Sequence, residues 1–326
     1  MRNVSELNFG RIALTDRLNS LLNIMNGHVW SVCAALPRPI RDSAVLFLQK
    51  QYAGFHPDDA RSFLLRYFHP PAWTILEHLN RRRRLSDETL SIILKAQASA
   101  MVVHMLDDHI VDGQVRPSHL LLHLRTAYWS YFTENLNSFQ TQLSIKQNVY
   151  GECVDAYLAG VHGSSTPLDG DQYRGEFLKQ AATWLIAPLL LAEDEQRAAV
   201  KSIYEDFALA WRLLDDVRDA ATDAATGDGT AVYFALDDDG RAEWKRVADE
   251  SISGATVSGD KVNEEQESPR IMRILHEKGV LDALIGEIHD RLARAASGAR
   301  RLGLDELAEE YEALARLRNG DEPAAG

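Results

Sequence analysis

The stretch ALAWRLLDDVRDAATD, residues 208–223, decides the fold class. Its apolar residues recur at spacings of three and four, which is the period of an α-helix. Asp215, Asp219 and Asp223 recur every four residues, so on a helix their carboxylates form one stripe with Asp216 beside it. Like charges at this spacing repel one another, and the helix must end soon afterwards at two glycines, where its dipole also disfavours anions. A bound cation would remove this penalty.

A second acidic cluster lies upstream in HMLDDHIVDG, residues 104–113. On a helix Asp108 and Asp112 project from one face about one turn apart, and the adjacent Asp107 reaches partway round. Magnesium prefers carboxylates, with water and phosphate oxygens as its remaining ligands. Solvated acidic faces are the alternative explanation, but both clusters are embedded in apolar helices. Two such clusters facing each other could hold several magnesium ions around a diphosphate.

The same helical period extends over most of the chain, in which Gly and Pro are sparse and no segment alternates as a strand does. The pattern predicts an all-α fold, a single-domain helical bundle over residues 1–319. A polar loop is expected at 252–268 and a disordered tail at 320–326. The predicted helices are 11–32, 40–52, 58–68, 70–80, 87–112, 118–138, 144–162, 170–192, 195–224, 240–251, 268–277, 279–302 and 304–318.

The bulk composition excludes several classes of protein. A net charge of −13 disfavours non-specific binding to nucleic acid. The two cysteines, Cys33 and Cys153, stand in no metal-binding or disulfide pattern, so we expect both in the core. No stretch approaches the roughly 18 uninterrupted apolar residues of a membrane span, and the N-terminus lacks the features of a secretory signal. We therefore expect a cytoplasmic protein without stable membrane insertion.

With these two acidic clusters the chain resembles the class I isoprenoid synthases, and in particular the trans-polyprenyl diphosphate synthases, whose two aspartate-rich motifs bind magnesium and diphosphate. Residues 208–223 are similar to the family's apolar run into DDxxD. GECVD, residues 151–155, is similar to the family's GQxxD, and YRGEFLKQAATW carries Lys179 where the family has a diphosphate-binding lysine. The resemblance covers roughly residues 95–235. It implies the isoprenoid synthase type of bundle with a central active-site cavity, and three magnesium ions as the cofactor. It also implies a homodimer, which is common in the family.

The resemblance also implies roles for individual residues in ionising an allylic prenyl diphosphate. The expected magnesium ligands are Asp108, Asp112, Asp215 and Asp219, with Asp107, Asp216 and Asp223 as further ligands or supports. The cations expected at the diphosphate are Lys179, Arg174 and Arg116. The aromatic residues expected to line the cavity are Trp184, Phe207, Trp211 and Tyr128.

The chain also departs from the family pattern. Its first motif reads as DDxxxD or DHxxD, according to whether Asp107 or Asp108 is taken as the start. The double arginine that follows this motif in the family is reduced to Arg116, and no GGKRxRP-like segment lies near the N-terminus. In the family these residues hold the second substrate, isopentenyl diphosphate. Arg38 and Arg41 are loose candidates for a replacement.

Several functions therefore stay open. The main hypothesis is a prenyltransferase of the polyprenyl synthase type. A terpene cyclase, which is a diphosphate lyase of the same fold, is the alternative, because the second aspartate stripe also has the spacing of the cyclases' NDxxSxxxE motif. Head-to-head prenyl coupling uses DxxxD pairs, and a non-catalytic helical scaffold would keep the acids for solubility. A di-iron bundle is excluded because no histidine has a glutamate three residues before it.

Overall fold

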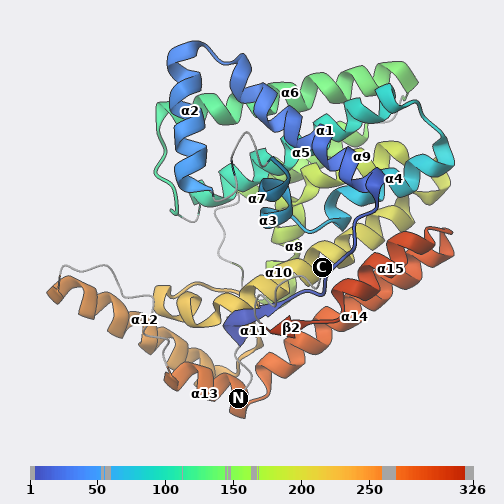
Figure 1. The fold of residues 1–326 in the computed structure, drawn as a ribbon. Coiled ribbons are helices and arrows are strands. Elements are labelled where there is room, and N and C mark those ends of the chain that lie inside the picture. Colours follow the sequence, from blue (N-terminus) through green and yellow to red (C-terminus); the bar gives the residue numbers. More distant parts are fainter. Residues whose placement is uncertain are drawn as a thin grey trace.

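A computed structural model describes residues 4–52, 55, 60–111, 113–143, 145, 148–162, 167, 169–258 and 269–319. Nearly all of these residues lie in α-helices, so the predicted all-α class is confirmed (Figure 1). Asp112, residues 259–268 of the predicted loop and the predicted tail at 320–326 lie outside the described residues.

The helices follow one another with short connections. The first half of the chain contains α1 (Asp16–Ala35), α2 (Arg38–Gln51), α3 (Ala60–Tyr67), α4 (Pro71–Arg83), α5 (Asp87–Val111), α6 (His119–Leu143) and α7 (Val149–His162). The second half contains α8 (Gly170–Gln180), α9 (Ala182–Leu191), α10 (Arg197–Thr226), α11 (Ala231–Ala235), α12 (Asp238–Ser258), α13 (Pro269–Glu277), α14 (Val280–Arg301) and α15 (Asp305–Leu314). Short 3₁₀ helices cover Val4–Glu6 and Asp194–Gln196.

Helix α5 lies at the centre of the bundle, against α1, α6 and α9. By length and composition it could cross a membrane, but 78% of its most apolar window is buried inside the fold. Burial on all sides explains why it is apolar around its whole circumference. Helix α10 packs along α14 on the other side of the molecule (Figure 1). The acidic clusters therefore stand at the ends of two helices that the core holds in place.

Three predicted boundaries are corrected by local hydrogen bonding. The first long helix begins at Asp16 rather than at residue 11, because the Oγ1 of Thr15 accepts a hydrogen bond from the Leu18 N–H at 3.3 Å and caps the helix. The last helix ends at Leu314, since the chain then pairs as a short strand. That strand, β2 (Arg318–Asn319), is antiparallel to β1 (Leu7–Asn8), an element that the sequence did not predict. Helix α12 continues through residue 258, into the predicted loop.

The predicted helix 170–192 is in fact two helices, because a side chain interrupts its backbone hydrogen bonds. The Nδ1 of His104 lies 3.0 Å from the carbonyl oxygen of Gln180, which can only accept, so Nδ1 carries the proton. The Trp184 N–H bonds instead to the carbonyl of Ala181, three residues back, at 3.0 Å. An inserted side chain of this kind kinks a helix. His104 of α5 thus sets the angle between α8 and α9.

Candidate active site

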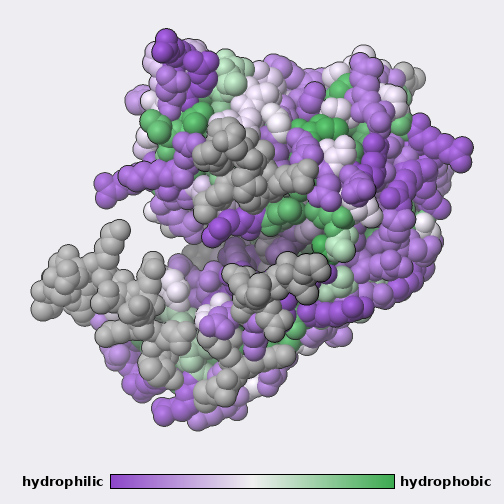
Figure 2. All heavy atoms as spheres, in the orientation of Figure 1, coloured by the Kyte–Doolittle hydropathy of each residue, from purple (hydrophilic) through white to green (hydrophobic). Residues whose placement is uncertain are grey.

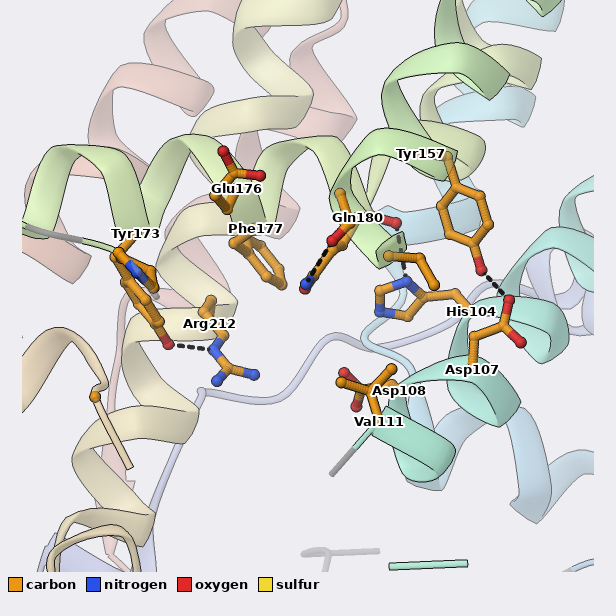
Figure 3. Close-up of a pocket in the computed structure, with 14 residues that line it drawn as sticks. His104, Asp107, Asp108, Val111, Tyr157, Tyr173, Glu176, Phe177, Gln180 and Arg212 are labelled. Carbon is orange, nitrogen blue, oxygen red and sulfur yellow. Dashed lines mark hydrogen bonds between the residues drawn. The ribbon is translucent and has the colours of Figure 1, made fainter. Parts of the chain in front are cut away.

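Two adjoining cavities of 220 and 750 Å³ lie between the acidic ends of α5 and α10. Figure 2 shows a hollow on this largely hydrophilic face of the molecule. The smaller cavity is drawn in Figure 3, where side chains from α5, α7, α8 and α10 converge on it. Four residues line both cavities: His104, Asp108, Phe177 and Arg212. The two cavities therefore form one continuous candidate site.

In the first aspartate cluster the two neighbouring acids differ in their surroundings. Asp107 is buried, and its carboxylate accepts hydrogen bonds from Arg125 Nε at 3.0 Å, Arg125 Nη2 at 2.8 Å and Tyr157 Oη at 2.5 Å. Asp108 has no such clamp among the described residues, and it lines both cavities. Arg125 and Tyr157 therefore occupy Asp107 and leave Asp108 to face the site.

The second cluster repeats this division of roles. Asp216 is 2% exposed and accepts from Tyr173 Oη at 2.8 Å and from the Ala231 N–H at 3.1 Å, with Arg212 Nε at 2.9 Å. Its neighbour Asp215 lines the larger cavity together with Asp108 of α5. One acid of each adjacent pair is thus held by an arginine and a tyrosine, while the other faces the site.

The other three acids of the stripe on α10 have raised pKa values, so their ionised forms are disfavoured in the absence of metal. Burial and the nearby Asp219 raise the pKa of Asp215 to about 6. Burial, together with Asp216 and Asp219, raises the pKa of Asp223 to about 8. The pKa of Asp219 is also raised, again chiefly by burial. A divalent cation would stabilise the ionised form of all three carboxylates, because an opposite charge nearby favours ionisation.

The donor set suits magnesium held partly by a substrate. Among the residues that the structure describes, no three His, Cys, Asp or Glu side chains lie close enough to hold a metal ion by themselves. Magnesium is commonly bound by one or two carboxylates, and waters and substrate phosphates complete its octahedron. Asp108 and Asp215 offer hard oxygen ligands from opposite walls of the larger cavity. The residues present therefore fit magnesium bound together with a phosphate-bearing ligand.

The three cations predicted at the diphosphate do not line the two cavities of the candidate site. Lys179 Nζ pairs with Glu176 at 2.7 Å, and the lysine lines a separate groove between α7 and α10. Arg174 forms a bidentate ion pair with Glu287 of α14, at 3.0 and 2.6 Å. Arg116 is exposed in the connection between α5 and α6. None of the three lines either cavity of the candidate site.

Sequence reasoning placed the aromatic wall only in part. Trp184 and Trp211 do line the larger cavity, whereas Phe207 and Tyr128 are buried outside it. The wall also contains aromatic residues that the sequence did not single out, namely Tyr67, Phe68, His69 and Phe177. Burial lowers the pKa of His69 to about 4, so its ring is neutral at physiological pH. The wall is therefore an uncharged aromatic surface beside Asp215.

Arginines from four separate segments border the larger cavity. They are Arg11 of the N-terminal segment, Arg66 of α3, Arg212 and Arg218 of α10, and Arg318 of β2. Arg318 donates from Nε to the Phe9 carbonyl at 3.0 Å, and the buried Nε of Arg218 has no hydrogen-bond partner among the described residues. Arg212 and Arg218 lie within residues 208–223, but no sequence motif joins them to Arg11, Arg66 and Arg318, which tertiary packing and the pairing of β1 with β2 bring to the cavity.

Comparisons with known proteins identify the fold. Neither a protein-family model nor a curated protein sequence matches the chain. The structure resembles a polyprenyl synthase from Caulobacter crescentus, crystallised with calcium and isoprenyl diphosphate, at 16% identity and a TM-score of 0.65 over 94% of this chain and 99% of that one.

Two further solved structures agree. A geranylgeranyl pyrophosphate synthase from Corynebacterium glutamicum matches at 14% identity and a TM-score of 0.64 over 95% of this chain and 97% of that one. A decaprenyl diphosphate synthase from Rhodobacter capsulatus matches at 16% identity and a TM-score of 0.55, over 87% of this chain and 98% of that one. The chain therefore has the all-helical fold of the class I isoprenoid synthases.

Proposed function

We propose that this protein is a magnesium-dependent class I isoprenoid synthase that ionises an allylic prenyl diphosphate, as a prenyltransferase of the polyprenyl synthase type. One observation carries the proposal: Asp108 of α5 and Asp215 of α10 line the same cavity from two different helices. Similar structures from Caulobacter and Corynebacterium were crystallised with a divalent metal and isoprenyl diphosphate, which supports this ligand class.

We assign metal binding to the acids of the two clusters that are not held by both an arginine and a tyrosine; of these, Asp108 and Asp215 line the larger cavity. Asp108, Asp215 and Asp219 would ligate magnesium, with Asp112 added from the sequence and Asp223 next to Asp219 along the stripe. Asp107 and Asp216 are positioning residues, because an arginine and a tyrosine already occupy their oxygens. Magnesium, when bound, would supply a Lewis acid that stabilises the negative charge developing on the leaving diphosphate.

The aromatic wall would shelter the allylic cation that ionisation leaves behind. Phe68, Trp184 and Trp211 contact one another edge-on or at a tilt, with ring centroids 5.3 to 6.1 Å apart. The faces of such rings attract a cation, and the rings exclude water that would quench it. This wall serves transfer and cyclisation equally.

The arginines around the larger cavity favour transfer over cyclisation. A prenyltransferase must hold a second diphosphate, which needs its own cationic cradle. Arg11, Arg66 and Arg318 border the cavity on the side of the N-terminal segment and β2, and could form that cradle in place of the missing family residues. A cyclase acts on a single diphosphate and therefore needs no second cationic cradle.

The test is incubation with magnesium and C10, C15 and C20 allylic diphosphates, each with and without isopentenyl diphosphate, followed by product analysis. Longer diphosphates formed only with isopentenyl diphosphate would support transfer. Hydrocarbons or alcohols from one substrate alone would replace it by cyclisation. Absence of diphosphate release by folded protein under every condition would refute the proposal. A cytoplasmic homodimer is part of the proposal, and light scattering after size exclusion tests the dimer.

A further inference from the structure

Arg212 stands between the two aspartate clusters. It precedes Asp216 by one helical turn on α10, and its side chain lines both cavities while remaining 28% exposed. Figure 3 shows its guanidinium directed into the space that Asp108 enters from the opposite side. It is the only arginine or lysine among the described residues that lines both cavities.

One edge of the Arg212 guanidinium is fixed by the protein. Its Nε donates to Tyr173 Oη at 2.7 Å and lies 2.9 Å from Asp216 Oδ1. The guanidinium carbon lies 5.7 Å from the ring centroid of Tyr173 and 5.8 Å from that of Phe177. The two terminal amino groups, Nη1 and Nη2, have no hydrogen bond to any other described residue. The Nε side of the Arg212 guanidinium is therefore fixed by Tyr173 and Asp216, and its Nη1 and Nη2 groups face the cavity.

We propose that the Nη1 and Nη2 groups of Arg212 bind the diphosphate of the substrate, the role that the sequence assigned to Lys179. This inference rests on the proposed function and adds a residue to it. A guanidinium matches phosphate oxygens with two parallel hydrogen bonds, and charge-assisted bonds of this kind are stronger than neutral ones. Because Tyr173 and Asp216 already order the side chain, diphosphate binding would lose little side-chain entropy.

A purely structural role for Arg212 makes a different prediction. In that case its only task would be to hold Asp216, and its loss would weaken magnesium and diphosphate binding together. Asp216 also accepts from Tyr173 and from the Ala231 N–H, so its position does not depend on Arg212 alone. Removing a cation beside Asp215 should favour magnesium and disfavour diphosphate. The two roles thus differ in the direction of the change in magnesium affinity.

The test is isothermal titration of wild-type protein and Arg212→Gln with Mg²⁺ alone, and with inorganic pyrophosphate at saturating Mg²⁺. We expect Arg212→Gln to lower the affinity for pyrophosphate by about tenfold or more, with Mg²⁺ affinity equal or higher. Arg212→Lys, which keeps the charge without the fork, should recover part of the loss. Arg294→Gln is the matched control, because Arg294 also pairs with an acid, Asp206 at 2.9 Å, but lines neither cavity.

The outcomes separate this inference from the proposed function. Pyrophosphate binding by Arg212→Gln that equals that of wild type overturns the inference and leaves the proposed function standing. A parallel loss of Mg²⁺ and pyrophosphate affinity, in protein with unchanged circular dichroism, also overturns it in favour of the structural role. Failure of folded wild-type protein to bind pyrophosphate with Mg²⁺ contradicts the proposed function, and the inference with it.

Discussion

Arg125 on α6 binds both carboxylate oxygens of Asp107 on α5, through Nε at 3.0 Å and Nη2 at 2.8 Å. The pair lies where α5 ends at the site, and Tyr157 of α7 completes it. Three helices are thereby joined at the first aspartate cluster. On the opposite wall Asp216 is likewise held by an arginine and a tyrosine, Arg212 and Tyr173, but Arg212 uses its Nε alone.

Arg125→Ala should destabilise the protein strongly, because it leaves Asp107 charged and buried with Tyr157 as its remaining side-chain partner. Breaking a buried ion pair on one side lowers the free energy of unfolding by about 3 kcal/mol. Urea unfolding followed by circular dichroism measures the change. Arg38→Ala is the control, since Arg38 forms an exposed pair with Asp42 that contributes about 0.5 kcal/mol or less. Equal effects of the two substitutions would contradict the structural role of Asp107.

His104→Leu should loosen the junction of α8 and α9, because the Gln180 carbonyl loses the partner that holds the kink. Because this carbonyl is only partly buried, its loss of a partner should cost about 1 kcal/mol, at the lower end for an unsatisfied group. His104→Asn should recover part of this loss, since an amide N–H can donate where Nδ1 did. Thermal unfolding of the three proteins measures the order, and equal stability of the Leu and Asn variants would contradict the assigned hydrogen bond.

Metal-free protein should lose stability as the pH rises from 6.5 to 8.5. The pKa of Asp223 is raised to about 8 in the folded state, so its stabilising contribution is present below its ordinary pKa and is lost as the pH passes 8. The buried His69, whose pKa is lowered to about 4, titrates outside this window. The melting temperature of wild type should therefore fall relative to that of Asp223→Asn as the pH rises, because the amide cannot ionise. A difference that stays constant with pH would contradict the raised pKa.

Protons on the aspartates of α10 compete with the metal for the same carboxylate oxygens. Magnesium needs the ionised carboxylates, so its affinity should rise between pH 6 and 8.5 as Asp215 and Asp223 lose their protons. The stabilisation of the protein by saturating Mg²⁺ and pyrophosphate should therefore be larger at pH 8 than at pH 6. A pH-independent metal affinity over this range would contradict a site built from these two acids.

Lys179→Ala should leave the affinity for pyrophosphate at saturating Mg²⁺ within about twofold of wild type. Lys179 pairs with Glu176 and points into a groove lined by Cys153, Leu185 and other residues of α7, α9 and α10. Lys179 lines neither cavity of the candidate site, so under the proposed function its loss should not remove a contact to the diphosphate. A tenfold loss of affinity on titration would contradict this placement and restore the role that the family resemblance implies.

Local patterns in the sequence were enough to predict the helices. The period of three and four predicted the helices that carry both acidic clusters, because burial of one face imposes that period on any core helix. The break at Ala181 could not be found in this way, since it depends on His104, which lies 77 residues away along the chain. The pairing of Leu7 with Asn319 is likewise a contact between the two ends of the described chain.

The sequence was enough to predict the aspartates that line the candidate site, but not the basic residues that line it. Stripes of aspartate can be read from helical spacing, but spacing does not reveal which acid of an adjacent pair is clamped by an arginine of another helix. Lys179 and Gln180 are neighbours, yet Gln180 lines the smaller cavity and Lys179 does not, because successive residues of a helix project about 100° apart. Arg212 lies inside residues 208–223, but the spacing of that stretch predicts a role for its aspartates and none for this arginine.

The most direct measurement is diphosphate release from a C15 allylic diphosphate with magnesium, compared among wild type, Asp108→Asn, Asp215→Asn and the exposed control Asp249→Asn on α12. Neutral amides keep the shape of the acids and remove the charge that binds metal. The account predicts a loss of turnover of about 100-fold or more in the first two variants, with unchanged helicity, and wild-type turnover in the control. Unchanged turnover in Asp108→Asn and Asp215→Asn would contradict it.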